Sequence, residues 1–225
     1  MSTSVDLGIG DEASIRVMFD GDRLEFMAEF ARNCFQTGPF RSRTGDMNSW
    51  QLDCRESIGA GAYAQAIAAE LILDAGGILQ FVGSGFGAYI LLGAILGVHG
   101  DGVTGALVRP ARKAYGRERL IEGAICPGER VCVVDDILNS GETACRIVRV
   151  LRDEGVQNIS YVCVFRYRWG TGVARLAQQG VDCRWLAEVV QLKHKSTARP
   201  KRRSLVRFWH FLSTQAECVQ ERFKT

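Results

Sequence analysis

Residues 131–143, VCVVDDILNSGET, constrain the fold of this chain more than any other segment. The four apolar residues 131–134 are typical of a strand that is buried on both faces. Residues 143–154 repeat apolar side chains at spacings of three and four, which predicts a helix. The polar turn between them therefore joins the carboxyl end of a strand to the amino end of a helix. In an open α/β sheet, ligands bind at this edge.

The residue types in this turn suit a phosphorylated sugar. Unpaired backbone N–H groups at a helix amino end, together with the helix dipole, favour a phosphate. The carboxylates of Asp135 and Asp136 can accept hydrogen bonds from sugar hydroxyls. We therefore predict a ribose 5-phosphate site. An ordinary strand, turn and helix that binds no ligand can have the same short sequence pattern. The predicted phosphate-binding residues are Asn139, Ser140, Gly141, Glu142 and Thr143.

The composition favours one sizeable core in a chain that does not enter a membrane. The chain has 225 residues, of which 47% are hydrophobic, and this is enough for one or at most two domains. Glycines interrupt the longest apolar stretch, 78–98, so we expect no membrane helix. The polar residues 1–14 lack the basic and then apolar pattern of a secretory signal, which predicts a cytoplasmic protein.

The cysteines and histidines give no sign of a metal site. The eight cysteines contain no C-x-x-C pair, and several fall in apolar patterns, so we expect reduced cysteines in the core. The three histidines lie far apart in the sequence, and we assign them no function. The net charge of +3 is unevenly placed, because basic residues crowd 109–119 and 193–207. A basic loop beside a phosphate site favours a polyanionic substrate.

Predicted helices and strands alternate along most of the chain. This alternation predicts an α/β fold with a mostly parallel sheet flanked by helices. The predicted helices are 20–34, 59–73, the stretch after Gly87 through Leu96, and 143–154, and the predicted strands are 50–54, 78–82, 103–108, 131–134, 159–165 and 183–189. We divide the chain into an amino-terminal helix and hood (1–58), an α/β core (59–190), and a basic linker with a terminal helix (191–225).

Two acids, two aliphatic residues, small polar residues, Gly and Thr, in this order, resemble the phosphoribosyl-diphosphate (PRPP) motif of the type I phosphoribosyltransferases. From 35 to 170 the chain is most similar to the orotate phosphoribosyltransferases of that family. The resemblance implies a type I fold with an amino-terminal hood. It also implies transfer of ribose 5-phosphate from PRPP to orotate, giving orotidine 5'-phosphate and diphosphate. Mg²⁺ would be the cofactor, held mainly by the substrate near Asp135 and Asp136.

The resemblance also assigns residues outside the central motif. Lys113 and Arg109 match the basic catalytic loop, whose charge would stabilise the departing diphosphate, and Asp135 and Asp136 complete the predicted catalytic set. Further PRPP contacts would come from Ser84, Gly85 and Arg112. Arg43 in the hood and Arg166 after a core strand would bind the base, because a guanidinium can hold the orotate carboxylate through two hydrogen bonds. The family also implies a homodimer.

Several positions depart from the family pattern. Pro110 and Tyr115 stand where a lysine and a histidine are expected in the loop. The residues 86–88, Phe-Gly-Ala, differ from the usual end of the diphosphate loop, and Gln51 stands where an aromatic residue often lines the base pocket. These changes affect the expected identity of the base and the expected catalytic rate more than they affect PRPP binding.

Two alternatives stay open from the sequence. A regulator with this fold could sense PRPP or a nucleotide and bind nucleic acid through the basic residues 193–207 and the aromatic residues that follow them. We do not favour it, because those aromatic residues have the spacing of a buried helix face. A transferase for another base would differ mainly in the hood, and Arg43 together with Arg166 argues against it.

Overall fold

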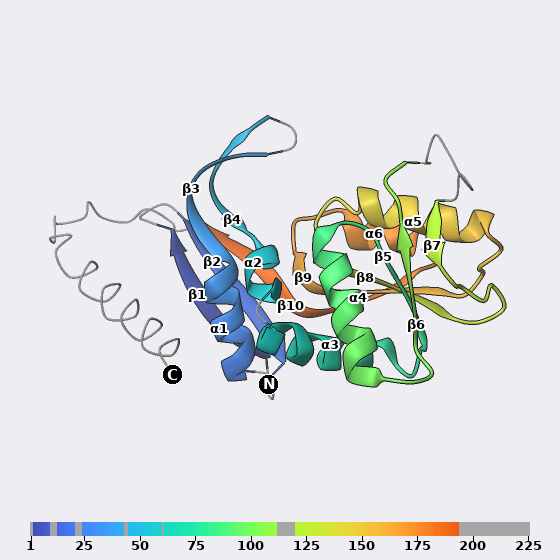
Figure 1. Cartoon of the computed structure of the whole chain (residues 1–225). Coiled ribbons are helices and arrows are strands. Elements are labelled where there is room, and N and C mark those ends of the chain that lie inside the picture. Colours follow the sequence, from blue (N-terminus) through green and yellow to red (C-terminus); the bar gives the residue numbers. More distant parts are fainter. Residues whose placement is uncertain are drawn as a thin grey trace, which may run out of the picture. The chain divides into compact units, whose positions relative to one another are not determined.

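The computed structural model describes residues 2–9, 13–20, 24–42, 45–59, 61–111 and 120–193 (Figure 1). An eight-stranded sheet has the order β1-β2-β10-β9-β8-β5-β6-β7. The five strands from β10 to β6 run parallel to one another, and antiparallel pairs occur only towards the two edges of this sheet. The predicted fold class, a mostly parallel sheet flanked by helices, is confirmed. The strands are β1 (Ser2–Ile9), β2 (Ala13–Asp20), β5 (Gln80–Gly83), β6 (Thr104–Val108), β7 (Ile121–Gly123), β8 (Val131–Leu138), β9 (Ile159–Tyr167) and β10 (Asp182–Lys193).

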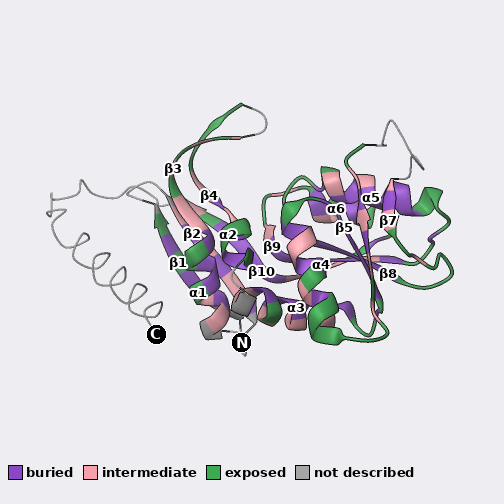
Figure 2. Cartoon of the chain, viewed as in Figure 1, coloured by how far each residue is buried: buried purple, intermediate pink, exposed green. Residues whose placement is uncertain are grey.

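Helices cover both faces of this sheet. Two hydrophobic clusters, one on each face, account for most of the buried side chains (Figure 2). The first four helices pack on one face, and the last two pack on the other. They are α1 (Leu24–Cys34), α2 (Cys54–Gly59), α3 (Gly61–Ala75), α4 (Phe86–His99), α5 (Glu142–Asp153) and α6 (Gly172–Ala177). None of the helices in the described ranges is long and apolar enough to cross a membrane.

An amino-terminal hairpin was absent from the sequence-based prediction, which treated residues 1–14 only as polar. Strands β1 and β2 pair in antiparallel register, and β2 then pairs with β10. The period-two signal is present in both strands, because Val5, Leu7, Ile15, Val17 and Phe19 are buried and alternate with more exposed residues. The predicted helix 20–34 is shorter than expected and begins at Leu24.

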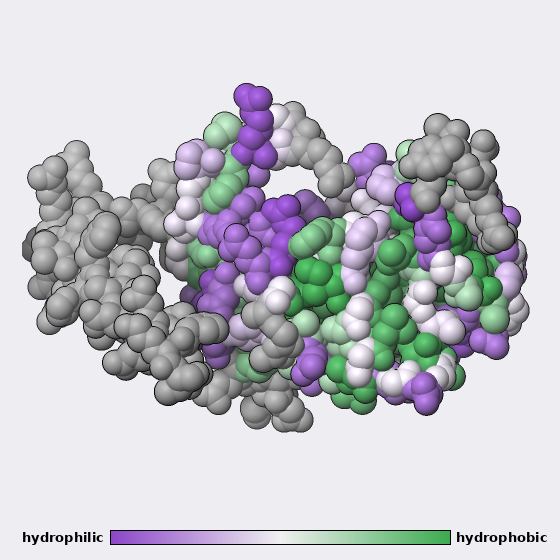
Figure 3. Space-filling model, viewed as in Figure 1, coloured by the Kyte–Doolittle hydropathy of each residue, from purple (hydrophilic) through white to green (hydrophobic). Residues whose placement is uncertain are grey.

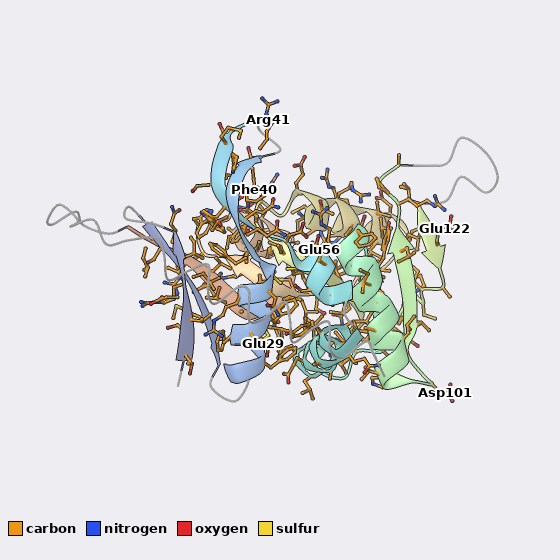
Figure 4. The ribbon with its side chains drawn as sticks, turned by 60° about the vertical axis from the view of Figure 1, so that its left-hand side comes forward. Glu29, Phe40, Arg41, Glu56, Asp101 and Glu122 are labelled. Carbon is orange, nitrogen blue, oxygen red and sulfur yellow. The ribbon has the colours of Figure 1, made fainter. Side chains whose placement is uncertain are left out.

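A second hairpin, here called the hood, lies within residues 1–58, the segment predicted to contain it. Strands β3 (Phe35–Arg41) and β4 (Met47–Leu52) pair as a two-stranded sheet of their own. Figure 4 shows Phe40 and Arg41 near the far end of this hairpin. The predicted strand 50–54 was misplaced, because β4 begins at Met47 and α2 starts at Cys54.

Strand β8 continues further than predicted. We expected it to stop at Val134, with Asp135 and Asp136 in the turn. Pairing with β9 instead continues through Asp135 and Ile137 to Leu138, which lies opposite Arg166. The apolar pair Ile137 and Leu138 and the length of β9 both favour this extension. Both aspartates therefore lie in a strand, where their side chains point to opposite faces.

The described cysteines are free thiols, as expected. Cys34, Cys54, Cys132, Cys145 and Cys163 are buried, whereas Cys126 is exposed. Burial raises the pKa of Cys132 to about 12, so that thiol stays protonated and packs as a small apolar group.

The stacking of Phe165 on Phe30 gives a test of the core. Their ring centroids lie 5.7 Å apart, and both side chains are fully buried. We expect Phe165→Ala to lower the free energy of unfolding by about 3–5 kcal/mol, because it removes apolar contacts and leaves a cavity. Leu73→Ala is the matched control, since Leu73 is 69% exposed, and it should change the value by less than about 0.5 kcal/mol. Urea unfolding measures the free energy of unfolding of both variants. If Phe165→Ala were as stable as Leu73→Ala, the packing of Phe165 on Phe30 would be contradicted.

Candidate functional site

A cavity of about 740 Å³ opens at the carboxyl end of β8. This volume lies in the range of small-molecule sites. Its wall combines the hood, the end of β8, the predicted phosphate loop 139–143 and the turn after β9. The lining residues are Ser42, Asn48, Trp50, Gln51, Leu52, Asp135, Ile137, Leu138, Asn139, Ser140, Gly141, Glu142, Thr143, Ala144, Tyr167, Trp169 and Gln191.

The phosphate loop has the geometry predicted for it. Gly141 is the residue before α5 and has a φ of 73°, in the left-handed region, which glycine adopts without strain. Gly141 has no side chain to cap the helix, and the N–H of Glu142 makes only a long contact of 3.5 Å with Ser140 Oγ. The first turn of α5 lies at the cavity wall. The N–H groups of a first helical turn, at the positive end of the helix dipole, bind anions well.

The turn after β9 packs directly against the backbone of this loop. Gly172 donates its N–H to the carbonyl oxygen of Asn139 at 2.8 Å. A Cβ atom on Gly141 would lie 2.6 Å from the Cα of Gly172, and one on Gly170 would lie 2.6 Å from the Asn139 oxygen. The two backbones can approach this closely only because all three positions are glycine.

Of the two aspartates of the motif, Asp135 is the one that lines the cavity. Its Oδ2 accepts a hydrogen bond from the hydroxyl of Tyr161 at 3.1 Å, and its Oδ1 accepts the N–H of Asp136 at 3.0 Å. Burial raises the pKa of Asp135 well above its usual value, and the neighbouring charge of Asp136 raises it further. A carboxyl group that protonates this readily can accept a hydrogen bond from a sugar hydroxyl or donate one to it.

Asp136 points to the other face of the sheet and is not among the cavity-lining residues. Its Oδ1 accepts the N–H of Ile137 at 2.9 Å. The carboxylate also lies against the first turn of α4, where a Cβ on Gly87 would come within 2.3 Å of its Oδ2. The predicted contact between Asp136 and the ribose stays a prediction.

Aromatic rings form another part of the cavity wall. Tyr167 and Trp169 stack with centroids 4.8 Å apart, and both meet the edge of Trp50 at 6.0 and 6.2 Å. Gln51 also lines the cavity, and its Nε2 donates to Gln36 at 2.8 Å. The prediction noted the missing aromatic at position 51 but not these three rings, although Trp50 and the segment RYRWG were visible in the sequence. A planar base can stack on such a wall.

The predicted diphosphate loop lies beside the cavity rather than in its wall. Ser84 and Gly85 follow β5, whose last residue, Gly83, is paired with Val134 of β8. Ser84 is buried, and its hydroxyl oxygen accepts a hydrogen bond from Arg146 of α5 at 2.9 Å. The sequence analysis missed Arg146, because a helical arginine has no local signal for such a contact.

Only part of the predicted basic loop can be placed. Arg109 at the end of β6 pairs with Glu122 of β7, with 2.7 Å between Nε and Oε1 (Glu122 is labelled in Figure 4). Arg112, Lys113 and Tyr115 lie outside the described residues. The same holds for Arg43 of the hood and for all of the basic segment except its first residue, Lys193, so the predictions for these residues stay untested.

Arg166 is held away from the cavity. Both Arg166 and Arg168 pair with the carboxylate of Glu188, the residue opposite Arg166 on β10. The Arg166 guanidinium also lies 4.0 Å from the ring centroid of Trp185, a favourable cation–π contact. Base binding by Arg166 remains a prediction, and it would require this guanidinium to leave Glu188.

Comparison with known proteins agrees with this geometry. Residues 111–196 match the phosphoribosyl transferase domain family. The orotate phosphoribosyltransferase of Rhodopirellula baltica is 25% identical over 179 residues, covering 75% of this chain and 92% of that protein. The Caenorhabditis elegans orotate phosphoribosyltransferase is 26% identical over 157 residues, which is 68% of each chain.

Solved structures agree as well. The Mycobacterium tuberculosis orotate phosphoribosyltransferase in complex with Fe(III) dicitrate has a TM-score of 0.63 and 26% identity, covering 72% of this chain and 93% of that chain. The same enzyme in complex with PRPP has a TM-score of 0.57 at 23% identity, covering 72% of this chain and 93% of that one. The chain therefore has the type I phosphoribosyltransferase fold, and its match to the phosphoribosyl transferase family extends over residues 111–196. Within that class, the relatives and structures described above are orotate phosphoribosyltransferases.

The contact between the phosphate loop and the 170–172 turn can be tested with Gly172→Ala. The added Cβ would lie 2.6 Å from Leu138 Cδ1 and 2.8 Å from the Asn139 oxygen, so the loop must shift. We expect the dissociation constant for PRPP, measured by calorimetry, to rise about tenfold or more, since loop geometry sets the phosphate contacts. Gly93→Ala in α4 is the control, because a Cβ there meets nothing within 4 Å. Unchanged PRPP binding in Gly172→Ala would refute this support function.

The pairing at Glu188 gives a pH test. Burial opposes ionisation, but hydrogen bonds and ion pairs with Arg168 and Arg166 lower the pKa of Glu188. Its contribution to stability is therefore full above about pH 4.3, the usual value, and is lost as the pH falls through the lower folded pKa. We expect Glu188→Gln to lower the free energy of unfolding by about 1–3 kcal/mol at pH 7 and by progressively less as the pH falls below about 4.3.

Denaturant unfolding at several pH values measures this difference. Asp6→Asn is the control, because its ion pair with Arg16 is exposed and should contribute little to stability at any pH. A Glu188→Gln effect that stays constant from pH 7 to pH 3 would rule out the ion pairs as its cause.

Proposed function

We propose that this protein transfers ribose 5-phosphate from PRPP to orotate, giving orotidine 5'-phosphate and diphosphate. One observation carries the proposal: a single cavity is lined by the predicted phosphate loop, by the aromatic side chains of Trp50, Tyr167 and Trp169, and by the Asp135 carboxylate. A ribose 5-phosphate that carries a planar base needs these three features at once. The modest identity to orotate phosphoribosyltransferases supports the choice of base.

In the proposed complex, the 5-phosphate accepts hydrogen bonds from the N–H groups of 139–143. Asp135 holds a ribose hydroxyl and fixes the sugar ring. The base stacks on Trp50 and Trp169, so its attacking nitrogen is positioned before the diphosphate departs. The C1–diphosphate bond breaks as the bond from C1 to the base nitrogen forms, and positive charge near the diphosphate stabilises the leaving oxygens. From the sequence, Lys113 and Arg112 would supply this charge, together with Arg109.

Mg²⁺ fits this site as a partner of the substrate. It prefers hard oxygen ligands and keeps several waters. The carboxylate of Asp135 in the cavity lining is one such ligand, and the phosphate oxygens of PRPP would provide others. When bound, the ion would neutralise part of the diphosphate charge.

We also propose a homodimer, as the family resemblance implies. Hydrophobic residues gather over α4 in Figure 3. Phe86 is 63% exposed, and Leu96 and Val98 are 38% and 43% exposed. Exposed apolar patches of this kind commonly mark interfaces. A cytoplasmic location stays a prediction from the sequence.

The decisive experiment follows the ultraviolet absorbance of orotate after mixing with PRPP and Mg²⁺. We expect consumption of orotate that stops when Mg²⁺ is chelated. Lys113→Ala should lower kcat by about 100-fold or more, because it removes charge that stabilises the leaving group. The control, Lys193→Ala, changes a basic residue at the end of β10 and should keep full activity. Binding of PRPP without orotate consumption would point to another base or to a regulator.

A further inference from the structure

The side chain of Arg146 joins three segments that are far apart in the sequence. Its Nη2 donates to the hydroxyl oxygen of Ser84 at 2.9 Å, and its Nη1 donates to the backbone oxygen of Arg109 at 2.8 Å. Arg146 itself lies in the second turn of α5, directly after the phosphate loop. The three segments are the phosphate loop with α5, the turn after β5, and the end of β6, where the basic loop begins.

The charge of Arg146 has no acidic partner among the described residues. Both of its hydrogen bonds go to neutral oxygens, and its side chain is only partly exposed. Cations that are partly removed from water are usually paired with an anion. Arg109 and Arg166, whose contacts also fall near this edge, differ in this respect, because Arg109 pairs with Glu122 and Arg166 pairs with Glu188. An unpaired guanidinium beside a phosphate site is suited to an anionic ligand.

The hydrogen bond to Ser84 also orients that hydroxyl. Ser84 uses a lone pair to accept from Arg146, so its own O–H remains available as a donor. A cation behind a hydroxyl makes it a stronger donor, because the two hydrogen bonds polarise each other. Ser84 is predicted to bind the diphosphate, so this donor would face developing negative charge on the leaving group.

The bond to Arg109 fixes the root of the basic loop. The N–H of Arg109 donates to Leu120 at 2.8 Å, and its side chain pairs with Glu122. Arg146 holds the carbonyl of the same residue. Its guanidinium therefore sets the spacing between the Ser84 turn and the point where the basic loop leaves the sheet.

We propose that Arg146 is a positioning residue for the diphosphate half of PRPP. It orients Ser84, fixes the start of the basic loop at Arg109, and places a positive charge within hydrogen-bond distance of both residues. This inference rests on the proposed PRPP-dependent transfer. It separates the two halves of the substrate, since the 5-phosphate is bound by 139–143 and the diphosphate depends on Arg146.

The test compares two fragments of the substrate on Arg146→Gln. Calorimetry measures binding of Mg²⁺–diphosphate and of ribose 5-phosphate to the full-length protein. We expect diphosphate binding to weaken at least tenfold and ribose 5-phosphate binding to change less than twofold. Arg146→Lys should recover part of the diphosphate affinity, because it keeps the charge but cannot bridge two acceptors. The matched control is Arg149→Gln on the same helix, because within the described part of the chain its guanidinium bonds only to the Cys145 carbonyl of its own helix.

Coupling to Ser84 gives a second readout. If Arg146 acts through Ser84, the double variant Ser84→Ala, Arg146→Gln should lose less diphosphate affinity than the sum of the single losses. Additive losses, or equal weakening of both fragments in Arg146→Gln, would overturn the proposal. If Arg146→Gln does not fold, Arg146→Lys and Ser84→Ala make the same comparison.

The two proposals fail differently. Wild-type protein that binds PRPP but leaves orotate unchanged would refute orotate transfer. The comparison of diphosphate and ribose 5-phosphate binding would still test whether Arg146 positions the diphosphate. Wild-type protein that binds neither fragment would refute both.

Discussion

Direct backbone packing between Gly141 and Gly172 sets the geometry of the site. The phosphate loop belongs to β8 and α5, and the aromatic turn belongs to β9 and α6. Parallel pairing brings the two strand ends together at Leu138 and Arg166, and the glycines then let the loops touch without side chains between them. The separation between the phosphate end and the base end of the cavity is thus set by backbone contacts. Side-chain motion can change it little, which suits a site that must hold two reactants in line.

Strand β8 uses its two faces for different purposes. Asp135 lies on the face that opens to the cavity, where burial raises its pKa. Asp136 lies on the opposite face and fills the space left by Gly87 at the start of α4. The alternation that buries Val131 and Val133 on one side, and Cys132 and Val134 on the other, reverses after the two aspartates, because Ile137 packs with Cys132 and Val134 and Leu138 packs with Val131 and Val133. The two acids of the motif are therefore not equivalent in this structure.

Local sequence signals predicted the centre of the molecule well. The buried strand, the glycine turn and the amphipathic helix of 131–154 each depend on neighbouring residues, and the parallel sheet follows from their repetition. The hairpin of β1 and β2 was missed because its short alternating pattern includes Asp6 and Gly8. The contacts of Arg146 with Ser84, and of Arg166 with Glu188, join residues 62 and 22 positions apart. Such pairs depend on strand order, which the spacing of single motifs does not contain.

The balance of charge explains why recognition and catalysis are separated in this fold. Among the described residues, the cavity lining contains two carboxylates, Asp135 and Glu142, and no arginine or lysine. In the proposed complex the phosphate is therefore held by neutral N–H groups and a helix dipole, which bind an anion without depending on a flexible charged side chain. The guanidinium of Arg175 donates to the Ser140 carbonyl of the same loop at 3.1 Å. Stronger positive charge is needed only where negative charge develops, at the leaving diphosphate. In this chain the sequence places positive charge in 109–119, and the structure adds Arg146. The part of the site that would recognise the sugar and base can therefore stay nearly neutral.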